Sequence, residues 1–328
     1  MTSKLASRRG SLRSSTRTFL SHLTYAGLVP PPPVFRPSGF SAFVIAKNEE
    51  DWAETSILPI CDFVDEVVLA NNGSEDATPD ILRRLTELRP EKIRYLNCSN
   101  LDFVATLNRL VSDCRYRWIL RWNADFVPRT SGPESLGELI NTLRGLDPLR
   151  YYCVSLSGVA LDGDLEHQFP ARRDPPEPLV FTCSPWLRYT VRERWESLHV
   201  PWFYQKVVLR SAYYFHMRSV KSALRMLQKR YWAEWFERRT LGDDVSMEDF
   251  IADRALSDFG GSSVEEAAQR YVIEEFQGCL PFSREECGDY PDLLRPFLKN
   301  PPFRLVFEDG KIVGRIEAPR HGPRRGHG

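Results

Sequence analysis

Three short polar segments in the first 130 residues have the side chains for a binding site, and each directly follows an apolar run. They are Lys47–Glu50, Asn71–Asp76 and Asn123–Asp125. The runs before them read as strands buried on both faces: Phe40–Ala46, Glu66–Ala70 and Trp118–Trp122. Ligands of parallel sheets bind beyond the carboxyl ends of the strands, so the three segments are expected to meet at one edge. There Asp125 would be a hard oxygen ligand suited to Mg²⁺ or Mn²⁺.

The stretches between these runs predict helices. The acidic start Glu49–Asp51 suits a helix N-terminus and predicts a helix to about Leu58. Thr78 and Pro79 predict the first turn of a second helix. A third strand and a third helix are expected at Ile93–Leu96 and Asp102–Cys114. Strands and helices that alternate at this spacing imply right-handed crossovers, so we expect an α/β fold with a mostly parallel sheet.

The three strand ends together resemble family 2 glycosyltransferases of the GT-A fold. In that family the first strand closes on Asn-Glu, as Val44–Glu50 does here. The second strand ends in an acid followed by a Gly-Ser-x-Asp-x-Thr turn, which corresponds to Asn71–Thr78. The fourth ends in a D-x-D element, which corresponds to Asn123–Asp125. The resemblance covers roughly residues 40–130 and, more loosely, His216.

The resemblance implies a Rossmann-like sheet flanked by helices and transfer of a sugar from a nucleotide-diphosphate-sugar donor to a hydroxyl acceptor. The reaction is expected to be inverting and to depend on a divalent cation, Mn²⁺ or Mg²⁺. Two other classes stay open: a non-catalytic nucleotide-sugar-binding protein, and a nucleotidyltransferase. The second class typically has a Gly-rich phosphate loop after the first strand, which Ala46–Glu49 lacks.

The resemblance also assigns site residues. Asp125 and His216 are the expected metal ligands, and donor contacts are expected from Lys47, Asn48, Glu49, Asn71, Asn123, Arg218 and Lys221. Asn71 and Asn123 stand where the family has aspartates. An amide can still hydrogen-bond a base or a ribose, but it brings no charge to a metal.

A basic helix face and one acid complete the expected site. The stretch Val220–Arg239 predicts an amphipathic helix whose basic side is suited to a diphosphate. Inversion needs a carboxylate that deprotonates the acceptor hydroxyl, and Glu196 is favoured for this role. It is chosen from five acids in the second half of the chain: Asp162, Asp164, Asp174, Glu193 and Glu196.

The rest of the chain predicts four segments. Residues 1–39 are expected to be a leader, basic and either disordered or amphipathic, with a Pro30–Pro33 linker; residues 1–48 contain seven Lys/Arg and no acid. A nucleotide-binding half is expected at 40–130, an acceptor-binding half with the metal histidine at 131–240, and a helical extension with a hairpin and a basic tail at 241–328. Pro170–Pro185 reads as a long loop or lid.

Composition limits the partners. The chain has 328 residues, of which 42% are hydrophobic and 27% charged, which is typical of a folded globular protein. Outside the first 48 residues, 37 basic residues stand against 44 acidic ones, so nucleic-acid binding is disfavoured. The seven cysteines contain no CxxC pair and favour a reducing compartment. We therefore expect a cytoplasmic protein, with peripheral membrane contact through the leader as a further possibility.

Overall fold

The computed structural model describes residues 36–192, 195–240 and 242–318. The expected leader falls almost entirely outside this range, so its membrane contact stays a prediction. None of the helices in the described part of the chain is long and apolar enough to cross a membrane.

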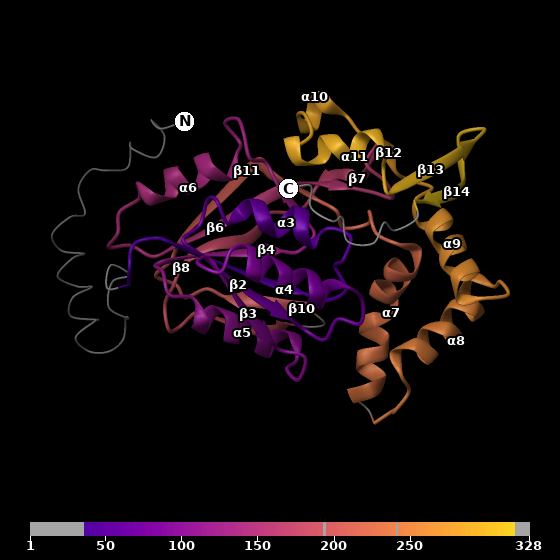
Figure 1. The fold of residues 1–328 in the computed structure, drawn as a ribbon, viewed down its shortest axis with the longest axis horizontal. Coiled ribbons are helices and arrows are strands. Elements are labelled where there is room, and N and C mark those ends of the chain that lie inside the picture. The colour runs from indigo at the N-terminus through magenta and orange to yellow at the C-terminus, as the bar shows by residue number, and fades with distance from the viewer. Residues whose placement is uncertain (1–35, 193–194, 241, 319–328) are drawn as a thin grey trace.

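One large mixed sheet forms the centre of the fold (Figure 1). Its parallel part has the order β4-β1-β2-β3, with bounds Trp118–Asn123, Phe40–Ala46, Glu66–Asn71 and Ile93–Asn97. Beyond β4 the sheet continues with antiparallel neighbours, β8 (Glu177–Thr182), β6 (Tyr152–Leu161) and β7 (His167–Arg173), and ends on β12 (Leu280–Pro281). β11 (Gln205–His216) runs parallel to β6 and antiparallel to β5 (Phe126–Pro128). The expected α/β class with a mostly parallel core is confirmed.

Alternate residues of β1 separate the two faces of the sheet. Phe40, Ala42 and Val44 are buried against three helices: α3 (Ala53–Ile60), α4 (Thr78–Leu88) and α6 (Leu136–Arg144). Phe43 and Ile45 face the other side, which is covered by α5 (Phe103–Asp113) and by the hairpin β9–β10 (Arg188–Arg192 and Trp195–His199). Both faces of the strand are therefore dry, as its continuous apolar sequence predicts.

The expectation of a loop or lid at Pro170–Pro185 is wrong. This stretch contains the end of β7 and all of β8, and Leu179, Val180 and Phe181 are fully buried. Pro178 lies at a register shift between β8 and β6, a place where a sheet tolerates a residue without an N–H.

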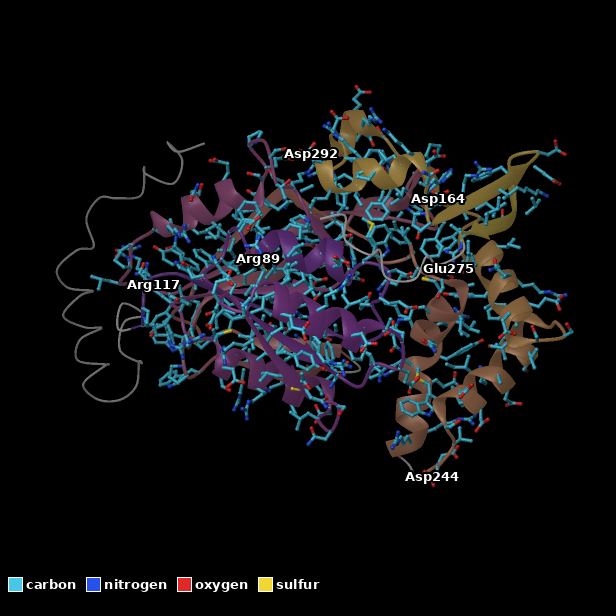
Figure 2. All side chains as sticks on the ribbon, viewed as in Figure 1. Arg89, Arg117, Asp164, Asp244, Glu275 and Asp292 are labelled. Carbon is cyan, nitrogen blue, oxygen red and sulfur yellow. The ribbon has the colours of Figure 1, made fainter. Side chains whose placement is uncertain are left out.

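The C-terminal part is helical and ends in a hairpin, as expected. It comprises α7 (Ala223–Thr240), α8 (Met247–Phe259), α9 (Val264–Glu275), α10 (Arg284–Cys287), the 3₁₀ turn η2 (Asp292–Leu294), α11 (Arg295–Lys299), β13 (Phe303–Glu308) and β14 (Lys311–Glu317). α7, α8 and α9 enclose a small apolar core of their own together with the hairpin. Asp164, labelled in Figure 2, lies beside the hairpin, and its Oδ2 accepts a hydrogen bond from Leu305 N at 2.9 Å.

The expected division of the chain at residues 130 and 240 stays a prediction. β8 and β11 belong to the segment 131–240, yet they pair with β4 and β5 of the preceding segment. The two halves therefore share one sheet.

An aromatic stack supports the carboxyl end of β4. The Tyr214 ring lies 4.0 Å from the Phe126 ring, centroid to centroid, and 5.8 Å from the Trp122 ring. Gly158 of β6 faces this stack: a Cβ atom added there would lie 2.1 Å from the Tyr214 ring. Because Phe126 directly follows Asp125, displacement of the stack would move Asp125.

We therefore expect Gly158→Ala to lower the free energy of unfolding by at least about 2 kcal/mol, since the buried ring cannot move without overpacking its neighbours. Gly314→Ala in β14 is the matched control, because nothing lies within 4 Å of its added Cβ, and a change below about 0.5 kcal/mol is expected. Urea unfolding of both variants measures the difference. Equal stability of the two variants would contradict this account of the stack.

Candidate active site

The loops that follow β1 and β2 are joined by Asn48. Its backbone has a positive φ of 54°, which turns the chain sharply after Lys47. Its N–H donates to Ser74 Oγ at 3.0 Å, and its Oδ1 accepts from Glu75 N at 2.8 Å. Asn48, an expected donor contact, therefore acts in this structure as the link between two strand ends.

Three further hydrogen bonds hold the same loops together. Glu50 N donates to Asp76 Oδ2 at 3.2 Å, and Ala77 N donates to Glu50 Oε2 at 3.1 Å. Glu49 N donates to Thr78 Oγ1 at 2.7 Å. These bonds hold the acidic residues in the loop, which is why α3 begins at Ala53 rather than at Glu49.

Asn71 shapes the turn after β2. Its Oδ1 accepts from Ser74 N at 3.0 Å, and the residue is 6% exposed. The amide oxygen is thus used within the chain at the position where the family has an aspartate. A contact between Asn71 and a base stays a prediction.

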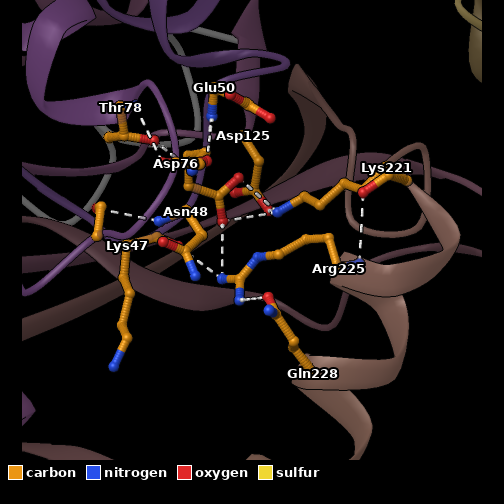
Figure 3. Close-up of polar contacts among 12 residues, drawn as sticks. Lys47, Asn48, Glu50, Asp76, Thr78, Asp125, Lys221, Arg225 and Gln228 are labelled. Atoms are coloured by element: carbon orange, nitrogen blue, oxygen red, sulfur yellow. Dashed lines mark hydrogen bonds and ion pairs between the residues drawn. The ribbon is translucent and has the colours of Figure 1, made fainter. Parts of the chain in front are cut away.

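The centre of the site is a buried lysine between two carboxylates from different strand ends (Figure 3). Lys221 Nζ, which lies just before α7, donates to Glu49 at 2.7 Å (Oε1) and 2.6 Å (Oε2). It also donates to Asp125 Oδ2 at 2.8 Å. Burial alone would lower the pKa of Lys221, but Asp125 and Glu49 outweigh that and raise it. For Asp125 burial acts in the other direction and would raise the pKa, but Lys221 and His216 hold that pKa well below its usual range.

His216, at the end of β11, lies between two carboxylates. Its Nδ1 is 2.8 Å from Asp174 Oδ2, and its Nε2 is 3.3 Å from Asp125 Oδ2. Burial would lower the pKa of His216, but the two acids raise it to about 9. Asp174 is one of the five acids that the sequence offers as the base. It lies 42 residues from His216 in the chain, so no local sequence pattern predicts their contact.

The basic side of α7 faces these groups. Lys221, Arg225 and Lys229 are spaced by four residues, and we call them the cation row. Arg225 Nη2 donates to Lys47 O at 2.6 Å and lies 3.9 Å from Glu49 Oε1. Burial, followed by the charge of Lys221, lowers the pKa of Lys229 to about 8. The side chain of Lys47 itself points away from the row (Figure 3).

A divalent cation held by Asp125 and His216 does not fit this donor set. His216 Nδ1 contacts Asp174, an arrangement that a metal-bound histidine also has, so the obstacle to a metal ion is the Lys221 ammonium at Asp125. The Asp125 oxygen nearest His216 already accepts from the Lys221 ammonium. Asn123, at the first position of the D-x-D element, brings no charge. The expected Mn²⁺ or Mg²⁺ therefore stays a prediction, and the arrangement of charges speaks against it.

Two expected residues lie apart from this cluster. Glu196, on β10, accepts from Arg121 Nη2 at 2.6 Å, and Arg121 precedes Asn123 by two positions on β4. Arg218 is exposed and lies over the Phe169 ring at 5.9 Å. No described residue hydrogen-bonds the Asn123 side chain, whereas its backbone oxygen accepts from Ser56 Oγ at 3.0 Å. Sequence reasoning missed Arg121 as the partner of Glu196.

Comparison with solved structures finds distant similarity to many chains, of which three are described here. TarS 1–349 from S. aureus is 12% identical, with 75% of this chain and 73% of that chain covered and a TM-score of 0.37. The mannosyltransferase PcManGT from Pyrobaculum calidifontis, in complex with GDP-Man and Mn²⁺, is 14% identical over 83% and 81%, with a TM-score of 0.37. The inositol-1-phosphate CTP transferase from T. maritima is 8% identical over 56% and 91%, with a TM-score of 0.34. No curated protein sequence matches the chain significantly.

The comparison with protein-family models matches more than half of the chain. The model of glycosyl transferase family 2 matches residues 41–213, which is 173 of the 328 residues. The match begins in β1 and ends within β11, so it includes the ends of β1, β2 and β4, whereas His216 and the cation row lie beyond it. With its GT-A type α/β fold, the chain therefore belongs to glycosyl transferase family 2 and is a glycosyltransferase.

Proposed function

We propose that the chain transfers a sugar from a nucleotide-diphosphate-sugar donor to a hydroxyl acceptor, with inversion at the sugar carbon. The observation that carries this proposal is the cation row, which faces the joined ends of β1, β2 and β4. A donor of this class loses a diphosphate, and the charge that develops on it must be neutralised by fixed cations. The strand ends are the ligand edge of such a sheet. We do not add a divalent cation, because the Asp125 carboxylate is already paired with the Lys221 ammonium.

The base that inversion requires is the second part of the proposal. Of the five acids considered, Asp164 is held by His167 Nδ1 at 2.8 Å, Asp174 is held by His216, and Glu193 lies outside the described residues. Glu196 is also paired, with Arg121, but its side chain is more exposed than those of Asp164 and Asp174, and Arg121 points to the side of β4 that carries Asn123. We assign it the removal of the acceptor proton.

Asp162 is the alternative acid. It follows β6 and lines a cavity of about 290 Å³ with Arg218 and Lys229, near the cation row. Burial raises the pKa of Asp162 to about 6, with the hydrogen bond to Ser219 opposing that rise. A carboxyl group with a raised pKa in a cleft is a candidate proton acceptor.

Hydrolysis of UDP-, GDP-, ADP- and TDP-sugars, with water as acceptor, tests the function. We expect Glu196→Gln to lower kcat by about 10²- to 10⁴-fold, the usual share of a general base. Donor binding, measured as a rise in Tm, should stay unchanged because Glu196 does not belong to the cation row. The anomeric configuration of the product, followed by NMR, should be inverted.

Glu308→Gln is the matched control for this variant, since Glu308 is exposed at the terminal hairpin and should leave kcat unchanged. If Asp162→Asn loses turnover while Glu196→Gln keeps it, the base is Asp162. A chain that neither binds nor hydrolyses any donor of the panel would contradict the proposed function.

Asp162 also predicts a pH dependence of stability. Its pKa is higher in the folded chain, about 6, than the ordinary 3.8, so the folded chain holds this proton more tightly and loses stability as the pH rises through this range. Asp162→Asn removes that loss. The variant should therefore gain up to about 3 kcal/mol over the wild type between pH 4 and pH 7 in urea unfolding. Asp244→Asn, in the exposed loop before α8, should show no such gain, and equal pH profiles of the two variants would contradict the assignment.

A further inference from the structure

The Lys221 side chain is a fixed cation at the place where the resemblance puts a divalent metal ion. Its side chain is only 1% exposed, and its ammonium lies within 2.8 Å of three carboxylate oxygens. One of these belongs to Asp125, the single charged residue at the D-x-D position. A lysine without partners is too costly to bury, so both carboxylates are needed to keep it there.

The backbone on either side of this ammonium is fixed as well. Trp52 Nε1 donates to Val220 O at 2.5 Å, and Arg315 Nη2 of the terminal hairpin donates to Lys221 O at 2.5 Å. Lys221 is therefore anchored from the first loop and from the last strand of the described chain. A side chain held on both sides in this way is preorganised, so that it needs no rearrangement when charge develops beside it.

One of the two hydrogen bonds between Glu49 and this cation can be exchanged for a bond to a substrate. Both Glu49 oxygens accept from the same ammonium, whereas one would be enough to pair the charges. A diphosphate oxygen can therefore replace one Glu49 oxygen while Asp125 keeps its bond. Arg225 and Lys229 continue the positive charge along α7, at the spacing of successive helical turns.

We propose that the Lys221 ammonium, supported by Arg225 and Lys229, takes the part of the divalent cation, so that this chain binds the donor diphosphate without a metal ion. The inference rests on the proposed function, because it names the group that binds the diphosphate of that donor. It departs from the metal dependence that the family resemblance implies. Its physical basis is that the Asp125 carboxylate is already paired with the Lys221 ammonium, which occupies the oxygen that a metal ion would need.

Binding of UDP and GDP to the full-length chain, measured by isothermal titration calorimetry, tests the inference. In EDTA and in Mn²⁺ the wild-type Kd is expected to agree within about threefold, since no metal takes part. A Kd that is more than about tenfold tighter in Mn²⁺ would overturn the inference and leave the proposed function standing. No binding in either buffer would contradict the proposed function and the inference with it.

Lys221→Met adds a second arm to this experiment. In EDTA it should weaken binding by about 10- to 100-fold, the loss expected for a charge-assisted hydrogen bond. Mn²⁺ should then restore part of the affinity, because the ion can occupy the space between Glu49 and Asp125. Lys206→Met, at an exposed lysine of β11, is the matched control and should bind as the wild type does.

Removal of Lys221 takes the ammonium away from two acids in the site, so circular dichroism must show that the variant is folded. If it is not, Lys229→Met provides the same test at the C-terminal end of the cation row, where several-fold weaker binding in EDTA is expected. Unchanged affinity of a folded Lys221→Met in EDTA would overturn the inference.

Discussion

The ion cluster of Lys221, Glu49 and Asp125 is the contact on which the rest of the site depends. It joins the end of β1, the end of β4 and the start of α7, segments separated by up to 172 residues in the chain. Each of the three charges would be costly to bury alone, and together they satisfy one another. The cluster thus fixes the distance between the C-terminal helices and the sheet edge, and with it the width of the space that a substrate can enter.

The rest of the fold supports this cluster from two sides. Asn48 accepts a positive φ so that the β1 and β2 loops can bond, and this places Glu49 over the sheet edge. On the other side, the Phe126 ring packs edge-on against His216 at 4.8 Å, centroid to centroid, and stacks on Tyr214. The stack orients Asp125 and His216 by packing, and Trp122 Nε1 ties it to α3 by donating to Ser56 Oγ at 3.1 Å. The positive φ of Asn48 on one side and apolar packing on the other therefore position the two carboxylates of the cluster, Glu49 and Asp125.

Much of this arrangement can be predicted from the sequence. Continuous apolar runs identify β1, β2 and β4, because strands buried on both faces have no other pattern. Asp309 and Gly310 identify the terminal hairpin, since both have a positive φ in the turn. The basic side of α7 is also visible as a four-residue spacing, and in the structure it faces the strand ends.

Other features have no local signal. The ion pair of Lys221 with Glu49 and the pairing of His216 with Asp174 join residues 172 and 42 positions apart, so no spacing rule finds them. β8 was hidden by the prolines around it, because tertiary burial of Leu179–Phe181 overrides their preference for loops. α3 begins later than the sequence predicts. The acids that suit a helix N-terminus instead bond the loop after β1 to the loop after β2. Glu196 and the donor contacts of Asn71, Asn123 and Arg218 stay predictions.

The central claim is that a protein-borne ammonium, rather than a metal ion, lies against the donor diphosphate. Its most direct test is a crystal structure of the chain with a nucleoside diphosphate, grown in MnCl₂ and measured at the manganese absorption edge. The account predicts a phosphate oxygen within hydrogen-bond distance of Lys221 Nζ and no anomalous peak beside Asp125. An anomalous peak coordinated by Asp125 and His216, with Lys221 moved away, would contradict it.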